Sequence, residues 1–479
     1  MRDYRGAVPV FRRVLPVAAV VVSCAVSLLA GRAGAESRYP EGLGAPVMSV
    51  SRNISLTPLE VSRVSAAARA AGAVAYPVRY AVFPMTAYAR GEEVLMQQPK
   101  GWRVPMGTRV LTVDYVRITG GNEMADVLAA GQVLMGSASA RIRGAQVGDT
   151  ITLRDKANTP RRFTVGMIVA NDFTDGEDLV MSMPDGFSMG VTKVARVNIV
   201  GFARSADVLA AMRKKGLDVG TEYRVRTSWS PKNPDETLGI ASMKLLLGEF
   251  AFQPTNSAAI HIEDSWRSSR IAWFHKFDAI PIQFNCHKEV IDAFEGAFRD
   301  VEKAGLRDEI DINVSQRYGG CFTARYNRLG GLFGAPSRHA FGAAMDLNTT
   351  TNPQWGRPHM NCDVVRIFRK WGFAWGGNFW PADGMHFEWV GERRDQLGFP
   401  SRFCRNNVPV PKVSDPTTTT TSVPTTTTAT TTVPPATTTV PTTTLSTTIP
   451  ATTLEPTTST APATSTTVPA PTTTSSTTP

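Results

Sequence analysis

The stretch SRHAFGAAMDLN, residues 337–348, joins a histidine to an aspartate seven positions later, with a glycine between them. Gly342 permits a tight turn after His339, because glycine adopts backbone conformations that other residues avoid. The segment after the turn alternates in polarity, so Asp346 lies on the opposite strand face from Met345. The stretch therefore predicts a turn followed by a half-buried strand that presents one carboxylate.

A second alternating motif, DGMHFEW, occupies residues 383–389. His386 and Glu388 share one face of the predicted strand, and the aromatic residues share the other. If the two strands are neighbours, His339, Asp346 and His386 point at one place. Two imidazoles and one carboxylate, with an open fourth position, are typical of a catalytic zinc site.

Asp383 stands three residues before His386, in the turn that enters this strand. From there a carboxylate can reach a water at the metal without ligating the metal itself. We therefore interpret Asp383 as a general base that later acts as general acid to the leaving amine.

Both motifs resemble those of a known family. SRHAFGAAMD fits the pattern SxHxxGxAxD, and DGMHFEW fits (D/E)xxH, of VanY-like zinc D-alanyl-D-alanine carboxypeptidases. The wider family includes D-Ala-D-Ala dipeptidases and phage L-alanyl-D-glutamate endolysins. YGGCFTAR at 318–325 and WGFAWGGNFW at 371–380 also match a close subgroup. The resemblance covers roughly residues 255–405 and implies a small antiparallel-sheet zinc peptidase fold with flanking helices.

The resemblance implies a role for each matching position. An arginine ahead of the first motif binds the substrate carboxylate or the oxyanion, and Ser337 supports the metal site or the substrate. Arg325 is our choice for this arginine and Arg317 is the competitor, while Glu388 orients a ligand rather than binding the metal. The implied zinc ligands are His339, Asp346 and His386, with Asp383 as the acid/base.

This resemblance, together with the export signal expected at residues 1–35, implies an exported zinc metallopeptidase that hydrolyses peptidoglycan stem peptides, foremost a D-alanyl-D-alanine carboxypeptidase. One alternative is an endopeptidase on the same scaffold, which needs an open groove instead of a closed pocket. The other is a non-catalytic envelope scaffold that binds the wall, without zinc dependence. The sequence does not separate the carboxypeptidase from the endopeptidase.

The preceding half of the chain predicts a second α+β domain of about 190 residues. Alternation predicts a strand within 109–121, helical spacing predicts a helix over 125–144, and residues 205–218 predict another helix. Residues 55–240 resemble the extracytoplasmic core domain of exporter-type ABC permeases. We find no catalytic cluster there, and we expect the domain to bind or position a partner.

The two ends of the chain indicate export. Residues 1–35 pair arginines with an apolar run and a small-residue end, which is typical of a signal peptide. Lipidation at Cys24 and retention as a membrane anchor remain alternatives. The Thr/Pro-rich tail cannot bury enough apolar surface to offset its ordering entropy, so we expect a disordered stalk. The expected division is a signal at 1–35, a linker at 36–54, domains at 55–240 and 241–410, and a tail at 411–479.

The charge and the cysteine content of the chain support a location outside the cytoplasm. The net charge of +10 falls to +6 without residues 1–35, which hold five arginines and one aspartate. This mildly basic balance suits a wall or membrane surface, and the absence of a Lys/Arg-rich block with interleaved aromatics argues against nucleic acid. The even cysteine count after Cys24 favours two disulfides in an oxidising compartment, with three pairings open: Cys286, Cys321, Cys362 and Cys404.

Overall fold

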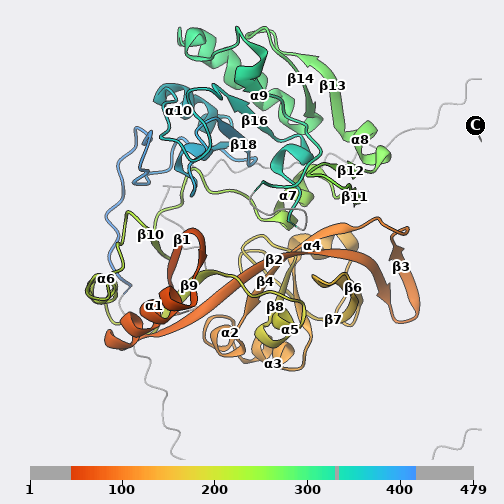
Figure 1. Ribbon diagram of the computed structural model, residues 1–479, viewed down its shortest axis with the longest axis vertical. Coiled ribbons are helices and arrows are strands. Elements are labelled where there is room, and N and C mark those ends of the chain that lie inside the picture. The colour runs from red at the N-terminus through yellow and green to blue at the C-terminus, as the bar shows by residue number, and fades with distance from the viewer. Residues whose placement is uncertain (1–44, 329–333, 417–479) are drawn as a thin grey trace, which may run out of the picture. The chain divides into compact units, whose positions relative to one another are not determined.

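The computed structural model describes residues 45–328 and 334–416, so the predicted signal, Cys24 and nearly all of the predicted tail lie outside the described residues. The described residues fall within one compact unit. Its fold is mixed α+β, as predicted, with a barrel followed by a small antiparallel sheet (Figure 1). No helix within the described ranges is both long and apolar enough to span a membrane.

The barrel is a closed ring of six strands, drawn in red to yellow in Figure 1. The ring closes through the 17-residue strand β2, because one stretch of it pairs with β4 and a later stretch pairs with β6. The side chains that fill the interior are apolar, including Phe83, Met106 and Ile151. In ring order the strands are β2 (Val74–Arg90), β4 (Val104–Leu111), β8 (Leu179–Ser182), β5 (Val133–Gly136), β7 (Pro160–Val169) and β6 (Thr150–Arg154).

Three more strands extend the sheet from β2, and β3 (Glu93–Gln97) pairs with the last residues of β2. They are β9 (Val194–Val200), β1 (Met48–Leu56) and the edge strand β10 (Tyr223–Thr227). β1 begins inside the stretch 36–54 that the sequence assigns to a linker. Met48 and Val50 are fully buried there, because they pack into a core against β9.

The helices around the barrel correct two local predictions. Residues 113–120 form helix α2 (Val113–Gly120) rather than a strand, because the Thr112 side chain accepts from the Tyr115 amide and caps it. The predicted helix over 125–144 is interrupted by β5, whose four residues are buried in the barrel. The other helices are α1 (Pro58–Ala70), α3 (Asn122–Ala129), α4 (Ser137–Arg143), α5 (Met183–Ser188) and α6 (Ser205–Lys214), and α6 confirms the prediction over 205–218.

The small sheet has the order β15 (Tyr318–Gly319), β16 (Ala344–Leu347), β18 (His386–Trp389), β17 (Phe373–Trp375), all antiparallel. The amphipathic helices α9 (Lys288–Lys303) and α10 (Cys362–Lys370) pack their apolar sides into the same core as the sheet. Two further helices are α7 (Ile240–Leu247) and α8 (Asp264–Arg270). Strand β11 (Phe252–Pro254) pairs with β12 (Ile260–Ile262), and β13 (Ile271–Lys276) pairs with β14 (Gln283–His287). Short 3-10 helices within the described residues are η1 (Arg307–Glu309), η2 (Ser315–Arg317), η4 (Arg338–Phe341) and η5 (Gly376–Asn378).

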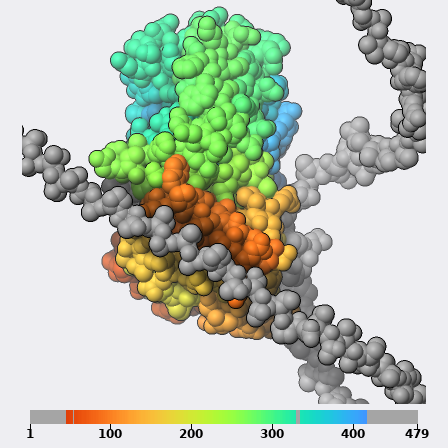
Figure 2. Space-filling model, turned by 90° about the vertical axis from the view of Figure 1, so that its right-hand side faces the viewer, coloured from red at the N-terminus to blue at the C-terminus, as the bar shows by residue number. Residues whose placement is uncertain are grey.

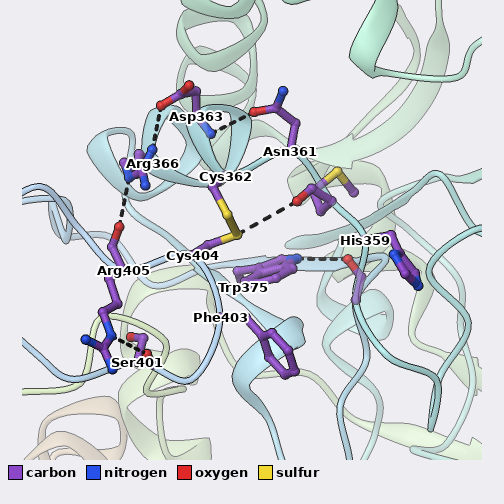
Figure 3. Close-up of a disulfide and its surroundings, with 12 residues drawn as sticks. His359, Asn361, Cys362, Asp363, Arg366, Trp375, Ser401, Phe403, Cys404 and Arg405 are labelled. Carbon is purple, nitrogen blue, oxygen red and sulfur yellow. Dashed lines mark hydrogen bonds and ion pairs between the residues drawn. A yellow bond between two sulfur atoms is a disulfide. The ribbon is translucent and has the colours of Figure 1, made fainter.

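Two disulfides brace the small sheet and confirm the prediction from the even cysteine count. Cys286 pairs with Cys321, and Cys362 pairs with Cys404. The second bond joins the start of α10 to the segment that follows the sheet, beside Trp375 and Phe403 (Figure 3). Trp375 donates from its indole nitrogen to the carbonyl of Gly384, 2.8 Å away, so this region is fixed by both covalent and hydrogen bonds.

Several contacts join the barrel to the small-sheet region. Arg103 and Phe252 exchange two main-chain hydrogen bonds of 3.0 and 2.9 Å, and Figure 2 shows the orange and green surfaces meeting. Helix α7 lies between the two cores, with Met243 in the small-sheet core and Lys244 turned to the barrel. The chain later returns to the barrel, where Asp415 accepts hydrogen bonds at the start of α6, although the predicted tail begins at 411.

Candidate metal centre

Strands β16 and β18 bring an aspartate and a histidine together. Their antiparallel register places Asp346 directly opposite His386, so both side chains lie on one face of the small sheet. The alternating neighbours Met345 and Phe387 are fully buried on the other face. The alternating pattern thus places the apolar side chains in the core and the polar side chains on the face that carries the site.

His339 reaches the same place from the short turn η4. The Ser337 hydroxyl accepts a 3.3 Å hydrogen bond from the His339 amide and caps this turn. The turn ends at Gly342, where φ is +67°, and a Cβ added there would meet the amide nitrogen of His287 at 2.8 Å. Only glycine fits this position, and the chain can therefore turn from His339 directly into β16.

The three side chains form a compact ligand set. The Nδ1 atom of His386 lies 3.1 Å from one Asp346 oxygen, and the Nε2 atom of His339 lies 3.4 Å from the other. One ligand atom of each residue lies within 4.8 Å of the other two. Within residues 45–328 and 334–416, this is the single group of three or more such side chains close enough to hold a metal ion.

The outward ring nitrogens of both histidines are also engaged. Nδ1 of His339 lies 3.1 Å from the carbonyl of Gly320, so it donates there and leaves Nε2 for a ligand. Nε2 of His386 lies 3.2 Å from a Glu388 oxygen, which leaves Nδ1 facing Asp346. Such outer partners fix the ring orientation of metal-binding histidines. The donor set and its supports fit a zinc ion.

The site is strongly polarised. Burial alone would raise the pKa of Asp346, but hydrogen bonds from His339 and His386 hold it well below its ordinary value. Burial would lower the pKa of His386, but its hydrogen bonds to Asp346 and Glu388 raise it to about 10. The carboxylates of Asp346 and Glu388 therefore favour a positive charge at His386, which either a proton or a metal cation can supply.

Glu388 is itself held by a cation. It is 4% exposed, and its second oxygen lies 3.4 Å from Nε of Arg338. Burial would raise the pKa of Glu388, but the charge of Arg338 and the hydrogen bond to His386 lower it. Glu388 thus stays a carboxylate that orients His386.

Asp383 lies at the entrance to β18 with one oxygen held and one oxygen without a partner. Oδ2 accepts a 3.0 Å hydrogen bond from Gln354, whereas Oδ1 is buried and has no hydrogen-bond partner among the described residues. Burial raises the pKa of Asp383, and the nearby Asp346 adds to this effect. A carboxylate with a raised pKa and a vacant oxygen has the properties required of a general base.

The two candidate arginines are placed differently. Arg325 lines the cavity that contains the ligand set, and its carbonyl accepts from the Ser337 amide at 2.9 Å. Arg317 does not line this cavity and instead pairs with Asp311 at 2.6 Å. The geometry therefore brings Arg325, but not Arg317, together with the ligand set.

The cavity of about 900 Å³ is lined by both regions of the molecule. From the small-sheet region come residues that sequence reasoning did not assign to the site, among them Gln354 and Phe379. From the barrel come Arg224 and neighbouring residues of β1 and β9. No motif marks these positions, because their place in the cavity depends on contacts between distant segments.

Comparisons with known proteins agree with the sequence motifs. Residues 334–389 match the family model described as D-alanyl-D-alanine carboxypeptidase, which confirms the resemblance of the two motifs. No curated protein matches the chain. A solved structure, the extracellular domain of the noncanonic ABC-type transporter YknZ from Gram-positive bacteria, is similar at 10% identity and a TM-score of 0.25, covering 38% of this chain and 99% of that one.

Proposed function

We propose that this protein is an exported zinc D-alanyl-D-alanine carboxypeptidase that trims peptidoglycan stem peptides. The observation that carries the proposal is the convergence of His339, Asp346 and His386 within a segment that matches a carboxypeptidase family model. The two disulfides support an oxidising compartment outside the cytoplasm.

His339, Asp346 and His386 are the residues that would hold zinc, through Nε2, the carboxylate and Nδ1 respectively. Zinc bound there supplies a Lewis acid for hydrolysis of the peptide bond. The hydrogen bonds to Gly320 and Glu388 keep both imidazoles oriented for this purpose.

Asp383 is the proposed general base and acid. Its buried Oδ1 takes a proton from the attacking water, and the carboxyl group then gives a proton to the amine of the departing D-alanine. Gln354 holds the other oxygen and so fixes the direction of the carboxylate. Arg325, in the same cavity, binds the terminal carboxylate of the peptide or the developing oxyanion.

The full chain without residues 1–35, loaded with zinc, should release D-alanine from a peptide that ends in D-Ala-D-Ala. Replacing both His339 and His386 with alanine should abolish metal binding and release. The matched control is His359→Ala, since His359 is an exposed histidine outside the cavity.

Activity that persists in the double variant would refute the zinc assignment. Mass spectrometry of muropeptide products separates the related activities: loss of a terminal alanine supports a carboxypeptidase, and internal cleavage identifies an endopeptidase. No cleavage of any muropeptide, with or without zinc, would favour a wall-binding scaffold.

A further inference from the structure

The cavity has a second wall, contributed by the edge strand β10 of the barrel. Arg224 and Arg226 alternate along this strand with Tyr223 and Val225, which pack into the barrel-side core. Because neighbouring residues of a strand point to opposite faces, both arginines are turned toward the cavity. The barrel therefore places cationic side chains in the same cavity as the candidate metal centre.

Arg224 contacts the loop next to the metal centre. Its guanidinium lies 5.1 Å from the centre of the Trp380 ring, and one of its nitrogens donates to the carbonyl of Asn378 at 2.9 Å. The intervening residue, Phe379, has its ring centre 6.0 Å from that of His386. Arg224 is thus separated from a proposed zinc ligand by one short loop.

The charge of Arg224 is not balanced by an ion pair. Among the described residues no carboxylate forms an ion pair with it, and the nearby Asp235 is bound by Arg369 through two hydrogen bonds of 2.8 and 2.6 Å. Burial lowers the pKa of Arg224 to about 10, and the charges of Arg226 and Arg402 act in the same direction. A partly buried cation among like charges gains free energy when an anion binds.

Other arginines of the same cavity show the contrast. Arg109 and Arg196 both pair with Asp175, and Arg338 pairs with Glu388. The positive charges of these arginines are therefore balanced by carboxylates of the protein itself. Among the described residues, Arg224 contacts one carbonyl and one aromatic ring, which leaves guanidinium donors for a ligand.

We infer that Arg224 binds a second carboxylate of the peptide substrate, on the amino-terminal side of the bond that is cut. The inference rests on the proposed function, in which Arg325 or the metal centre receives the carboxy-terminal end. A cavity of about 900 Å³ is large enough for several residues of a peptide. A guanidinium matches a carboxylate with two parallel hydrogen bonds, and stem peptides carry such a group on an internal acidic residue. The barrel is then a specificity element of the peptidase.

The test uses the zinc-loaded full chain and two peptides that end in D-Ala-D-Ala. The peptides are identical except that one has a free internal carboxylate and the other has a carboxamide. We expect kcat/KM to be about tenfold or more higher for the acid, and Arg224→Gln to remove this preference mainly through KM. For the carboxamide peptide, Arg224→Gln should lower kcat/KM by a smaller factor than it does for the acid peptide.

Two further variants keep the test decisive. Arg213→Gln changes an exposed arginine of α6 outside the cavity and should leave the preference intact. Arg224→Lys retains a charge but not the planar fork, so it should restore part of the preference if Arg224→Gln folds poorly. Equal kcat/KM values for both peptides in the wild type would overturn the inference and leave the proposed function standing.

If neither peptide is cut, the proposed function fails, and calorimetric binding still tests Arg224. Tighter binding of the acid peptide to the wild type than to Arg224→Gln supports the inference. Equal binding of acid and carboxamide to the wild type overturns it.

Discussion

The barrel and the small sheet each bury a cluster of charges, but the clusters differ in their counter-charges: a lysine in the barrel cluster and histidines beside the aspartate of the small sheet. At the barrel, Asp178 is fully buried and lies 2.7 Å from the ammonium of Lys244, which also pairs with Glu249 at 2.8 Å. Further hydrogen bonds reach Asp178 from Ser139 and from the Gly107 amide. Fixed cations and donors satisfy this aspartate completely.

In the small sheet the corresponding aspartate faces imidazoles. Asp346 lies beside His386 and His339, whose nitrogens can either carry a proton or donate a lone pair to a metal. Glu388 adds negative charge behind His386. Burial alone does not make a site, because the identity of the counter-charge decides whether a carboxylate is structural or can bind a metal.

The largest effect should come from Asp383, because it is the proposed general base. Its buried Oδ1 has no hydrogen-bond partner among the described residues and is available to accept a proton. Asp383→Asn should retain zinc and lower D-alanine release by about 10²- to 10⁴-fold. Metal content and turnover, measured on the same preparation, check this result. Loss of zinc from the variant would make Asp383 a ligand and would enlarge the site.

A substitution in the barrel cluster should lower the free energy of unfolding rather than the catalytic activity. Lys244→Met leaves Asp178 and Glu249 without their common cation, so the free energy of unfolding should fall by about 3–5 kcal/mol. Urea denaturation measures this change. The matched control is Lys370→Met, which removes an exposed ion pair with Asp300 and should cost at most about 1 kcal/mol. Similar losses in both variants would mean that the barrel cluster contributes no more to stability than an exposed ion pair.

A substitution at Glu388 tests whether the orientation of His386 affects zinc affinity. Glu388→Gln keeps an oxygen near His386 but removes the negative charge, so zinc affinity should fall by about 10- to 100-fold. Competition with a chromogenic chelator gives the affinity. An unchanged affinity would mean that the Arg338–Glu388 pair is structural, like the barrel cluster.

Glu177 lies between the two clusters and should give the smallest effect. Burial raises its pKa to about 7, and the charge of Asp178 acts in the same direction. Because the folded pKa lies above the unfolded one, the protonated carboxyl favours folding, and this contribution is lost as the pH rises from about 4.5 to 7.

Glu177→Gln should therefore be more stable than the wild type by about 1–2 kcal/mol at pH 8, with a difference that shrinks toward pH 5. Since the side chain is only partly buried, we expect less than the full shift to appear as stability. Denaturation at both pH values measures the change. A difference that is constant with pH would mean that Glu177 does not titrate in this range.

Local patterns determined much of this protein. Alternation in AAMDLN and HFEW correctly predicted which residues face the core, since Met345 and Phe387 are buried and Asp346 and His386 share a face. The even cysteine count correctly predicted two disulfides. A cap at Thr112, by contrast, was missed, because short apolar runs with helical or strand spacing look alike until their partners are known.

Only the tertiary structure decided the rest, because it depends on contacts between residues far apart in the chain. The pairing of β2 with both β4 and β6 closes the barrel, and no local pattern encodes a ring. The placement of Arg325 in the cavity, and of Arg317 beside Asp311 outside it, likewise depends on distant contacts. The position of Arg224 in the cavity depends on β10 meeting the loop at Asn378, 154 residues later in the chain. The sequence determined the chemistry of the candidate site, and the tertiary structure decided what surrounds it.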